Sequence, residues 1–451
     1  MKKNDELIVD IIDNGMDGEG IAKVDGFTIF VPGAICGEKV KIGIVKVLKT
    51  HGFGRVIEII ESSKYRREND CKTFPRCGGC DLRHVDYNYT LEMKEKRIEN
   101  LFKKEKIDVT VKPCVGMDDP FFYRNKLQYP FGVNKDGKPV MGVFAKRSHN
   151  VIETKECMIQ DKLCQKVAES VFEFIKNNNI SVYSEENLKG FVRHCIVRIG
   201  KKSNEVMVTL VTNKGEFKET NKLVNELTTK FPEIKSIVRN INDKNTNVIL
   251  GRENEVLFGS GYIKDNLLGF DFEISPMSFY QVNPIQTEKL YSKAIEYAEL
   301  TGKESIFDLY CGIGTIGICA SKGAKMLYGI ETVPEAIEDA KKNAYLNNVE
   351  NSEYFVGNVE DVLPKLVEER DIKADVCFID PPGKGCETIV LETLLKVKPE
   401  KIVYVSCNPA TLVRDVKVLL DEYEIKEVTP VDMFPYTSHV ETVAVLKLKN
   451  I

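Results

Sequence analysis

The chain has 451 residues, too many for one ordinary domain, and its hydrophobic fraction of 43% and charged fraction of 29% are those of a soluble globular protein. No apolar run approaches the roughly 18 to 20 residues of a membrane span and the start lacks a signal-peptide core, so we expect a cytoplasmic monomer without a membrane partner. The net charge of −4 argues against a nucleic-acid partner, but an excess of basic residues in 61–160 and of acidic residues in 301–451 indicates a polyanion-binding front half and an acidic catalytic half.

Residues 1–60 read as short strands separated by Gly-containing turns, for example "GIAKVDGFTIFVPG". Small closed β-barrels are built in this way, and OB-like barrels often bind single-stranded nucleic acid. The pattern alone is equally compatible with a purely structural barrel. We therefore predict an N-terminal, OB-like β-barrel domain over residues 1–60.

A cysteine-containing loop and a charged helix follow the barrel. The loop "CKTFPRCGGC" contains Cys71, Cys77 and Cys80, and "ETKECMIQ" adds Cys157. Four thiolates can hold either zinc or an iron–sulfur cluster, and zinc is the commoner interpretation of such spacing. Most other cysteines are expected to be structural residues, since free cysteine is usually buried; these are Cys36, Cys114, Cys164, Cys195, Cys319 and Cys377.

Residues 61–270 form the predicted central α+β domain. Strands and helices alternate there without a phosphate-binding fingerprint, and basic residues are interleaved with aromatic ones. The candidates for a groove that binds an RNA backbone are Arg124, Lys126, Lys146, Arg147, Arg193 and Arg198, with Phe121, Tyr123 and Tyr129 as stacking faces. For any single one of these residues, a solvated strand face or a core position is the simpler interpretation.

Residues 271–451 are predicted to form a Rossmann-like α/β domain, because strands and helices alternate regularly. In "DLYCGIGTIG" the glycines Gly312, Gly314 and Gly317 form a G-x-G-x-x-G motif after a strand, and Glu331 ends the next strand about 20 residues later. This pattern indicates a cofactor with an adenine nucleoside but does not separate NAD from S-adenosylmethionine. Asp380 in "IDPPGKG" ends another strand and is expected to face the same crevice.

Cys407 lies between a predicted strand at 401–405 and a predicted helix that begins with Asn408 as N-cap. Because the amino end of a helix carries partial positive charge, we predict a lowered pKa for the Cys407 thiol and a role as nucleophile. Carbon 5 of uracil becomes able to attack a methyl sulfonium after a thiolate adds to carbon 6. A base must then remove the carbon 5 proton, and Glu441 is the candidate.

Taken together, these motifs resemble a known family. "QVNP" at 281–284, "DLYCGIGTIG" at 308–317, "IDPPGKG", "SCNP" at 406–409 and "HVET" at 439–442 are similar to the bacterial RNA uracil-5-methyltransferases of the TrmA/RlmD type. Residues 1–60 are similar to the TRAM domain, which the ribosomal-RNA branch carries and the transfer-RNA enzyme lacks. The resemblance implies methylation of 23S rRNA with S-adenosylmethionine.

The resemblance also implies roles for particular residues. Cys407 is implied as nucleophile and Glu441 as base. The implied cofactor-site residues are Gln281, Tyr310, Gly312, Gly314, Thr315, Glu331 and Asp380. A [4Fe–4S] cluster is implied at Cys71, Cys77, Cys80 and Cys157. One departure is Gly383, which stands where the family usually has arginine, so a contact near the target nucleotide is in doubt.

Three other functions remain open at this point. A tRNA uracil-5-methyltransferase would use the same chemistry on another RNA. An RNA cytosine-5-methyltransferase also needs a thiolate on carbon 6, but Cys386 follows the Asp-Pro-Pro motif too late for that arrangement. A non-enzymatic RNA-binding or folding factor would not need Cys407 and Glu441, and both are present.

Overall fold

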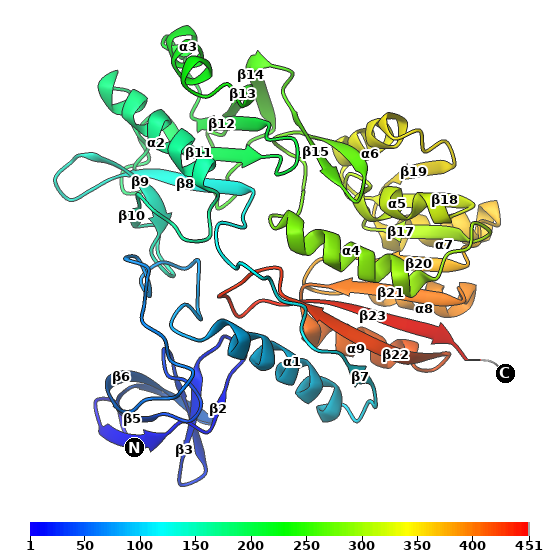
Figure 1. The fold of residues 1–451 in the computed structure, drawn as a ribbon, viewed down its shortest axis with the longest axis horizontal. Coiled ribbons are helices and arrows are strands. Elements are labelled where there is room, and N and C mark those ends of the chain that lie inside the picture. The colour runs from blue at the N-terminus through cyan, green and yellow to red at the C-terminus, as the bar shows by residue number, and fades with distance from the viewer. Residues whose placement is uncertain (450–451) are drawn as a thin grey trace.

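The computed structural model describes residues 1–449. Within them the chain forms three large sheets in sequence order and one short hairpin, β15 (Ile263–Leu267) with β16 (Phe270–Ile274). Figure 1 shows the first two sheets as separate bodies beside the third, which occupies the C-terminal part. No helix among these residues is long and apolar enough to cross a membrane.

The first sheet has six strands in the order β1-β5-β6-β4-β3-β2. Its strands are β1 (Glu6–Asp10), β2 (Asp13–Asn14), β3 (Gly20–Val24), β4 (Phe27–Val31), β5 (Lys39–Val47) and β6 (His51–Glu61). Alternate apolar side chains such as Ala22, Ile29 and Ile42 are completely buried in its small core. Period-two alternation of this kind is what the sequence of residues 1–60 predicts for a sheet with one buried face.

The segment after the first sheet joins the last sheet. Helix α1 (Tyr87–Lys104) is capped by Asp86, whose side chain accepts a hydrogen bond from the backbone of Tyr89. The helix packs against β22 (Tyr423–Val431) and α9 (Pro409–Leu419) of the C-terminal part. Strand β7 (Thr110–Val111) pairs in parallel with β22. Residues 87–111 therefore add an outer helix and an edge strand to the C-terminal sheet, although the sequence alternation places them in the central domain.

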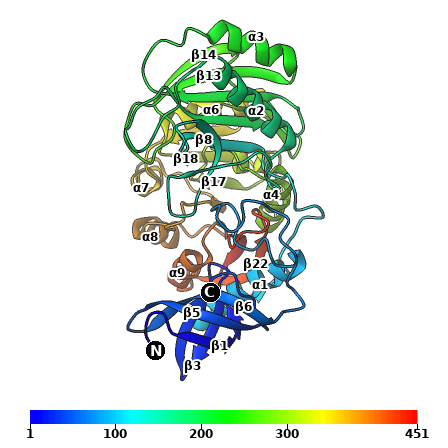
Figure 2. The ribbon, with the colours of Figure 1, turned by 90° about the vertical axis from the view of Figure 1, so that its left-hand side faces the viewer.

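The second sheet has seven strands in the order β10-β9-β8-β11-β12-β13-β14. Its elements are β8 (Lys126–Val133), β9 (Pro139–Phe144), β10 (Val151–Glu153), α2 (Lys162–Asn177), β11 (Val192–Ile199), β12 (Val206–Thr212), α3 (Thr220–Lys230), β13 (Ile234–Ile241) and β14 (Glu253–Gly259). Every residue of β11 and β12 is buried, and α2 packs against β11. In Figure 2 this sheet and the N-terminal sheet lie at opposite ends of the molecule.

The third sheet has the order β19-β18-β17-β20-β21-β23-β22-β7. Its strands are β17 (Ser305–Leu309), β18 (Met326–Glu331), β19 (Ser352–Val356), β20 (Val376–Ile379), β21 (Lys401–Ser406), β22 (Tyr423–Val431) and β23 (Glu441–Leu448). The first five of these are parallel, and β23 is antiparallel to both its neighbours. This is the Rossmann-like α/β sheet that the sequence predicts.

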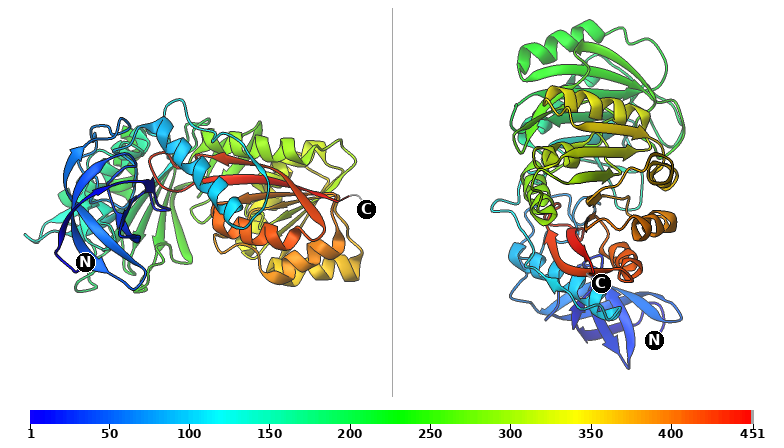
Figure 3. Two further views of the ribbon diagram at one scale, coloured as in Figure 1. Left: turned by 90° about the horizontal axis from the view of Figure 1, so that it is seen from below. Right: turned by 90° about the vertical axis from the view of Figure 1, so that its right-hand side faces the viewer.

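Helices cover both faces of this sheet. They are α4 (Pro284–Ala298), α5 (Thr315–Ala320), α6 (Pro334–Leu346), α7 (Val359–Arg370), α8 (Thr388–Val397) and α9 (Pro409–Leu419). Side chains of α4, α5 and α6 belong to one hydrophobic cluster, and side chains of α1, α7, α8 and α9 to another. Figure 3 shows the sheet between these two layers. The two-sided cover explains why the strands read as continuous apolar runs.

Candidate active site

The predicted site residues gather at the carboxyl ends of neighbouring strands in the third sheet. Tyr310 follows β17, Glu331 ends β18, Asp380 follows β20 and Cys407 follows β21. In the sheet, β18 lies on one side of β17 and β20 lies on its other side, so the strand order reverses at β17. Ligands of open α/β sheets bind at such a reversal of strand order, outside the carboxyl ends. The topology therefore brings these four residues to one edge of the sheet.

The turn between β17 and α5 is shaped by residues with positive φ. Gly312 has φ 55° and Gly314 has φ 81°, and Tyr310 adopts φ 65° in the same turn. Glycine adopts such angles without a steric penalty, whereas a tyrosine held there is strained. The Gly312 backbone N–H donates to Glu331 Oε2 at 3.1 Å, and the Val333 N–H donates to Oε1 at 3.0 Å. Two backbone N–H groups thus fix the Glu331 carboxylate at the carboxyl end of β18.

Asp308 is a site residue to which the sequence interpretation gave no role. Its Oδ2 accepts a 2.8 Å hydrogen bond from the Gly317 N–H, and its buried Oδ1 has no hydrogen-bond partner among the described residues. Burial, with the negative charges of Asp380 and Glu331, raises the pKa of Asp308 to about 7. An acidic residue inside the apolar run before the glycine motif is the signal that identifies it. Its contact with Gly317 ties β17 to α5.

The remaining predicted cofactor residues are Thr315, which begins α5, and Gln281, which precedes α4. The hydroxyl of Thr315, at the start of α5, is 3.2 Å from the hydroxyl of Tyr291 on α4. Gln281 precedes α4 and is buried, and its backbone carbonyl accepts a 3.0 Å hydrogen bond from the side chain of Asn125. Asn125 precedes β8, so this contact connects the second sheet to the segment that enters the third domain.

Cys407 lies at the junction of β21 and α9. The Asn408 side chain caps α9 by accepting a 3.1 Å hydrogen bond from the Ala410 N–H, as the sequence predicts. Of the thirteen cysteines, all within the described residues, Cys407 alone is exposed. Ser406 of β21 pairs with Thr442 of the antiparallel strand β23. Cys407 follows Ser406 and Glu441 precedes Thr442, so these two residues meet at one end of the strand pair.

The predicted lowering of the Cys407 pKa is wrong for the free protein. Although the residue is exposed to solvent, its thiol is half-buried, and this partial burial, reinforced by the charges of Glu441 and Asp380, raises the pKa of Cys407 to about 11. Burial and the charge of Asp380 likewise raise the pKa of Glu441 to about 8, and burial raises the pKa of Asp380 to about 7. Two nearby carboxylates and desolvation outweigh the partial positive charge of the helix end.

The loop after β20 is attached to α9 by a set of hydrogen bonds. The Gly383 carbonyl accepts from Asn408 Nδ2 at 2.9 Å and from Thr411 Oγ1 at 3.2 Å. A Cβ atom at Gly383 would lie 3.6 Å from Cys407 Sγ, which is ordinary van der Waals contact. Cys386, the alternative nucleophile, is buried, and its N–H donates to Asp415 at 2.8 Å. The loop therefore places Gly383, and not Cys386, beside the exposed thiol.

Several basic residues predicted for an RNA groove are internal instead. Arg193 donates to the Asn242 carbonyl at 2.6 Å, and Arg198 donates to the Ser278 carbonyl at 3.1 Å, and both side chains are buried. Tyr123 and Tyr129 are also buried, so they offer no stacking face. These four predictions are wrong because the guanidinium groups and rings form the interior of the second sheet and its junctions.

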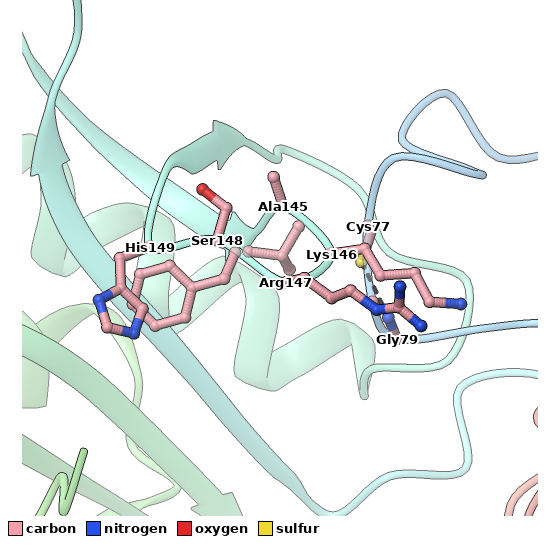
Figure 4. A pocket seen from close by; sticks show the side chains of 10 residues that line it. Cys77, Gly79, Ala145, Lys146, Arg147, Ser148 and His149 are labelled. Atoms are coloured by element: carbon pink, nitrogen blue, oxygen red, sulfur yellow. Dashed lines mark hydrogen bonds between the residues drawn. The ribbon is translucent and has the colours of Figure 1, made fainter. Parts of the chain in front are cut away.

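The loop at 145–149 does carry basic side chains at the surface. Ala145 forms an isolated β-bridge with Cys77, and Lys146 forms an ion pair with Asp81 at 2.8 Å. Figure 4 shows Lys146 and Arg147 extending beside Cys77 and Gly79, with His149 at the other side of the same hollow. This loop and the cysteine-containing loop therefore share one basic surface.

The four cysteines proposed as cluster ligands line one small cavity. Its walls are formed by Cys71, Thr73, Phe74, Cys77, Gly79, Cys80, Arg83, Cys157, Met158 and Ile159. Residues 1–449 contain no group of three or more His, Cys, Asp or Glu side chains arranged to hold a single metal ion. The loops thus bring the four thiols to one cavity, and the iron–sulfur cluster itself stays a prediction.

Comparisons with known proteins agree with this architecture. Residues 86–449 match the model of the tRNA (uracil-5-)-methyltransferase family, and residues 2–57 match the TRAM domain. An uncharacterized RNA methyltransferase of Halalkalibacterium halodurans is 47% identical over 453 residues, covering 100% of this chain and 98% of that protein. One of Clostridium tetani is 46% identical over 448 residues, covering 99% of this chain and 97% of the other.

A solved structure is similar over nearly the full length. The Pyrococcus abyssi tRNA (uracil-54, C5)-methyltransferase, in complex with S-adenosyl-L-homocysteine, has a TM-score of 0.79 and 30% identity, covering 98% of this chain and 100% of that chain. The resemblance inferred from the motifs is confirmed by these matches. The chain therefore belongs to the tRNA (uracil-5-)-methyltransferase family and carries a TRAM domain at residues 2–57.

Proposed function

We propose that this protein uses S-adenosylmethionine to methylate carbon 5 of a uridine in 23S rRNA, through a covalent bond between Cys407 and carbon 6 of the base. The observation that carries the proposal is the meeting of the exposed Cys407 with Glu441 at one end of the β21 and β23 ladder, beside Asp380. A nucleophile, a candidate base and a cofactor-side carboxylate lie together there. A vestigial RNA-binding factor would not need this set.

The chemistry divides between Cys407 and Glu441. The Cys407 thiolate adds to carbon 6, and the resulting enolate has enough electron density at carbon 5 to attack the methyl group of S-adenosylmethionine, whose carbon–sulfur bond breaks so that S-adenosylhomocysteine leaves. The Glu441 carboxylate then accepts the proton from carbon 5, the bond between Cys407 and carbon 6 breaks, and the uracil ring is restored. Each residue must be deprotonated before its step.

The raised pKa values make this deprotonation depend on what occupies the crevice. In the free protein burial, reinforced by the charges of Glu441 and Asp380, raises the pKa of Cys407, and burial with the charge of Asp380 raises that of Glu441. A positively charged sulfonium beside Asp380 offsets this repulsion and favours the ionised thiol and carboxylate. We therefore infer that the site is held in its unreactive, protonated form until the cofactor binds.

The assignment of S-adenosylmethionine follows from the family and from the related structure that contains S-adenosyl-L-homocysteine. In this chain Glu331, held by two backbone N–H groups, is placed to accept hydrogen bonds from the ribose. Asp380 lies at the neighbouring strand end. The other proposed contacts come from Tyr310 and Thr315, which lie at the same turn, and from Gln281, which precedes α4.

RNA is the proposed macromolecular substrate. The basic loop with Lys146 and Arg147 offers contacts to phosphates beside the cysteine-containing loop (Figure 4). On the TRAM domain, the rings of Phe30, His51 and Phe53 are half-buried, and their centroids lie no more than 5.8 Å apart. These rings offer faces on which bases can stack. The target uridine must be unstacked to reach Cys407, which favours a single-stranded or loop site.

A tRNA uridine is the second candidate substrate, favoured by one specific observation. The Pyrococcus abyssi tRNA enzyme matches 98% of this chain, including its N-terminal sheet, so the TRAM domain does not by itself separate rRNA from tRNA enzymes. The proposal of 23S rRNA therefore depends on the likeness of residues 1–60 to the bacterial ribosomal branch. Mass mapping of RNA from a deletion strain decides: loss of 5-methyluridine from 23S rRNA supports the proposal, and loss from tRNA alone overturns it.

We also propose that Cys71, Cys77, Cys80 and Cys157 hold a [4Fe–4S] cluster. The four thiols line one cavity, and four cysteine thiolates are the usual ligand set of such a cluster. A cluster at this place braces the loops that carry the basic surface. Protein purified without oxygen is expected to be brown and to contain iron and inorganic sulfide, and stoichiometric zinc without either would overturn the assignment.

A further inference from the structure

The cavity of the four cysteines has one basic side chain in its wall, Arg83. Arg83 is only 1% exposed. Its Nε donates to Asp70 Oδ1 at 2.6 Å and its Nη2 donates to Asp70 Oδ2 at 2.8 Å. Its Nη1 is buried and has no hydrogen-bond partner among the described residues. An unpaired donor on a buried cation is costly, so this group calls for a partner that the protein chain does not supply.

The other side of the same guanidinium contacts the segment that leads to Glu441. The Arg83 guanidinium carbon lies 4.3 Å from the centre of the Tyr436 ring, in cation–π geometry. The Tyr436 carbonyl accepts hydrogen bonds from the Asp81 and Leu82 N–H groups at 3.0 and 2.9 Å. Tyr436 itself has φ 64°, which is strained for a bulky residue. Glu441 follows five residues later as the first residue of β23.

We infer that Arg83 is a positioning residue that donates a hydrogen bond from Nη1 to the anionic cluster in the four-cysteine cavity and, through Tyr436, holds residues 432–440 in place before Glu441. The inference rests on the cluster proposed above. Four thiolates give such a cluster a net negative charge, which a cation in the cavity wall compensates. Hydrogen bonds to cluster sulfurs and nearby charge are the means by which a protein stabilises and tunes such a group.

Arg67 provides a matched control because it shares the partners of Arg83 but does not line the cavity. Its Nη2 donates to Asp70 Oδ2 at 2.9 Å and its Nη1 donates to the Tyr436 hydroxyl at 2.7 Å. Replacing Arg67 therefore weakens the same loop contacts and leaves the cavity wall unchanged. Replacing Arg83 removes the cavity contact as well.

The test measures cluster retention in the full-length holoprotein. Wild type, Arg83→Ala, Arg83→Lys and Arg67→Ala are purified without oxygen, and cluster absorbance is followed after addition of an iron chelator. Loss of an outer-sphere partner commonly costs 10- to 100-fold in metal affinity, so we expect Arg83→Ala to lose its cluster about 10-fold faster than wild type. Arg67→Ala should stay close to wild type. Arg83→Lys, which keeps the charge and much of the volume, should be intermediate and remains informative if Arg83→Ala does not fold.

Hydrogen exchange of residues 432–440 provides a second readout. We expect faster exchange there in Arg83→Lys holoprotein and in wild type after cluster removal. Equal cluster loss in the Arg83→Lys and Arg67→Ala proteins, or wild-type protein without iron and sulfide, overturns the inference. A cluster whose stability depends on Arg83, in a protein that does not methylate uridine, would overturn the proposed function and leave the role of Arg83 intact.

Discussion

Replacing Glu441 with glutamine should stabilise the protein by an amount that grows with pH. Glu441 is 5% exposed, and its pKa is raised from 4.5 to about 8 by burial and by Asp380. A carboxyl with a raised folded-state pKa stabilises the fold most below its unfolded pKa, and this contribution is lost as pH rises through the folded value. Glutamine resembles the protonated acid in shape and does not ionise.

The size of the effect follows from these two pKa values. The unfolded chain ionises Glu441 above pH 4.5, whereas the folded protein keeps it protonated up to about pH 8. At 1.36 kcal/mol per pH unit, this difference lowers the free energy of unfolding by about 3 kcal/mol at pH 7 and by less than about 1 kcal/mol at pH 5. For a cooperative unit of 150 to 250 residues, 1 kcal/mol corresponds to about 2 to 4 °C in Tm. Glu441→Gln should therefore raise Tm by roughly 6 °C or more at pH 7 and by about 1 to 3 °C at pH 5.

The assay is thermal unfolding followed by circular dichroism at pH 5, 6, 7 and 8, at one scan rate. Glu400→Gln is the control, since Glu400 is exposed just before β21 and its replacement should leave Tm nearly unchanged at every pH. If the Tm of Glu441→Gln differs from that of wild type by the same amount at pH 5 and at pH 8, the reasoning is refuted. It would mean that the carboxyl is already ionised in the folded protein.

Four further outcomes are expected. Cys407→Ala should abolish methyl transfer, and on a denaturing gel it should form no covalent adduct with RNA that contains 5-fluorouridine. An adduct that survives in Cys407→Ala but is lost when the buried Cys386 is replaced by alanine would assign the nucleophile to Cys386. Glu441→Gln should accumulate a gel-stable adduct that already carries the methyl group, because the carbon 5 proton has no acceptor; methylated free product at the wild-type rate would remove Glu441 as the base. In wild type saturated with S-adenosylmethionine, kcat/KM for RNA should reach half its maximum at a pH below about 8, the pKa of Glu441 in the free protein, because the cofactor's positive charge favours the carboxylate; a profile that rises only above pH 8 would contradict this. Asp380→Asn should weaken S-adenosylmethionine binding in calorimetry, and unchanged affinity would place Asp380 outside the cofactor site.

Sequence patterns were sufficient to predict the third sheet and the gathering of its strand ends. Apolar strands followed by Gly312, Asp380 and Cys407 indicate residues that emerge at one sheet edge, because parallel strands share their carboxyl ends. The N-cap role of Asn408 and the start of β23 at Glu441 also follow from local sequence. These features depend on nearby residues in the chain.

The features that could not be predicted depend on contacts between distant segments. The pKa of Cys407 is set by burial and by Glu441 and Asp380, and no local pattern encodes their combined effect. Arg193 and Arg198 are buried because the carbonyls that accept from them come from later loops. The sequence likewise does not reveal that β7 pairs with β22. Each of these results needs the tertiary arrangement.

The pairing of α1 and β7 with the last sheet has a consequence for synthesis on the ribosome. Lys94 on α1 forms its buried ion pair with Asp432, which lies 338 residues later in the chain. At about 5 to 20 residues per second, that partner leaves the ribosome roughly 20 to 70 seconds after Lys94. During this interval the second sheet can fold from a continuous stretch, while the apolar face of α1 remains uncovered. A chaperone that shields nascent chains should therefore bind α1 until translation is complete.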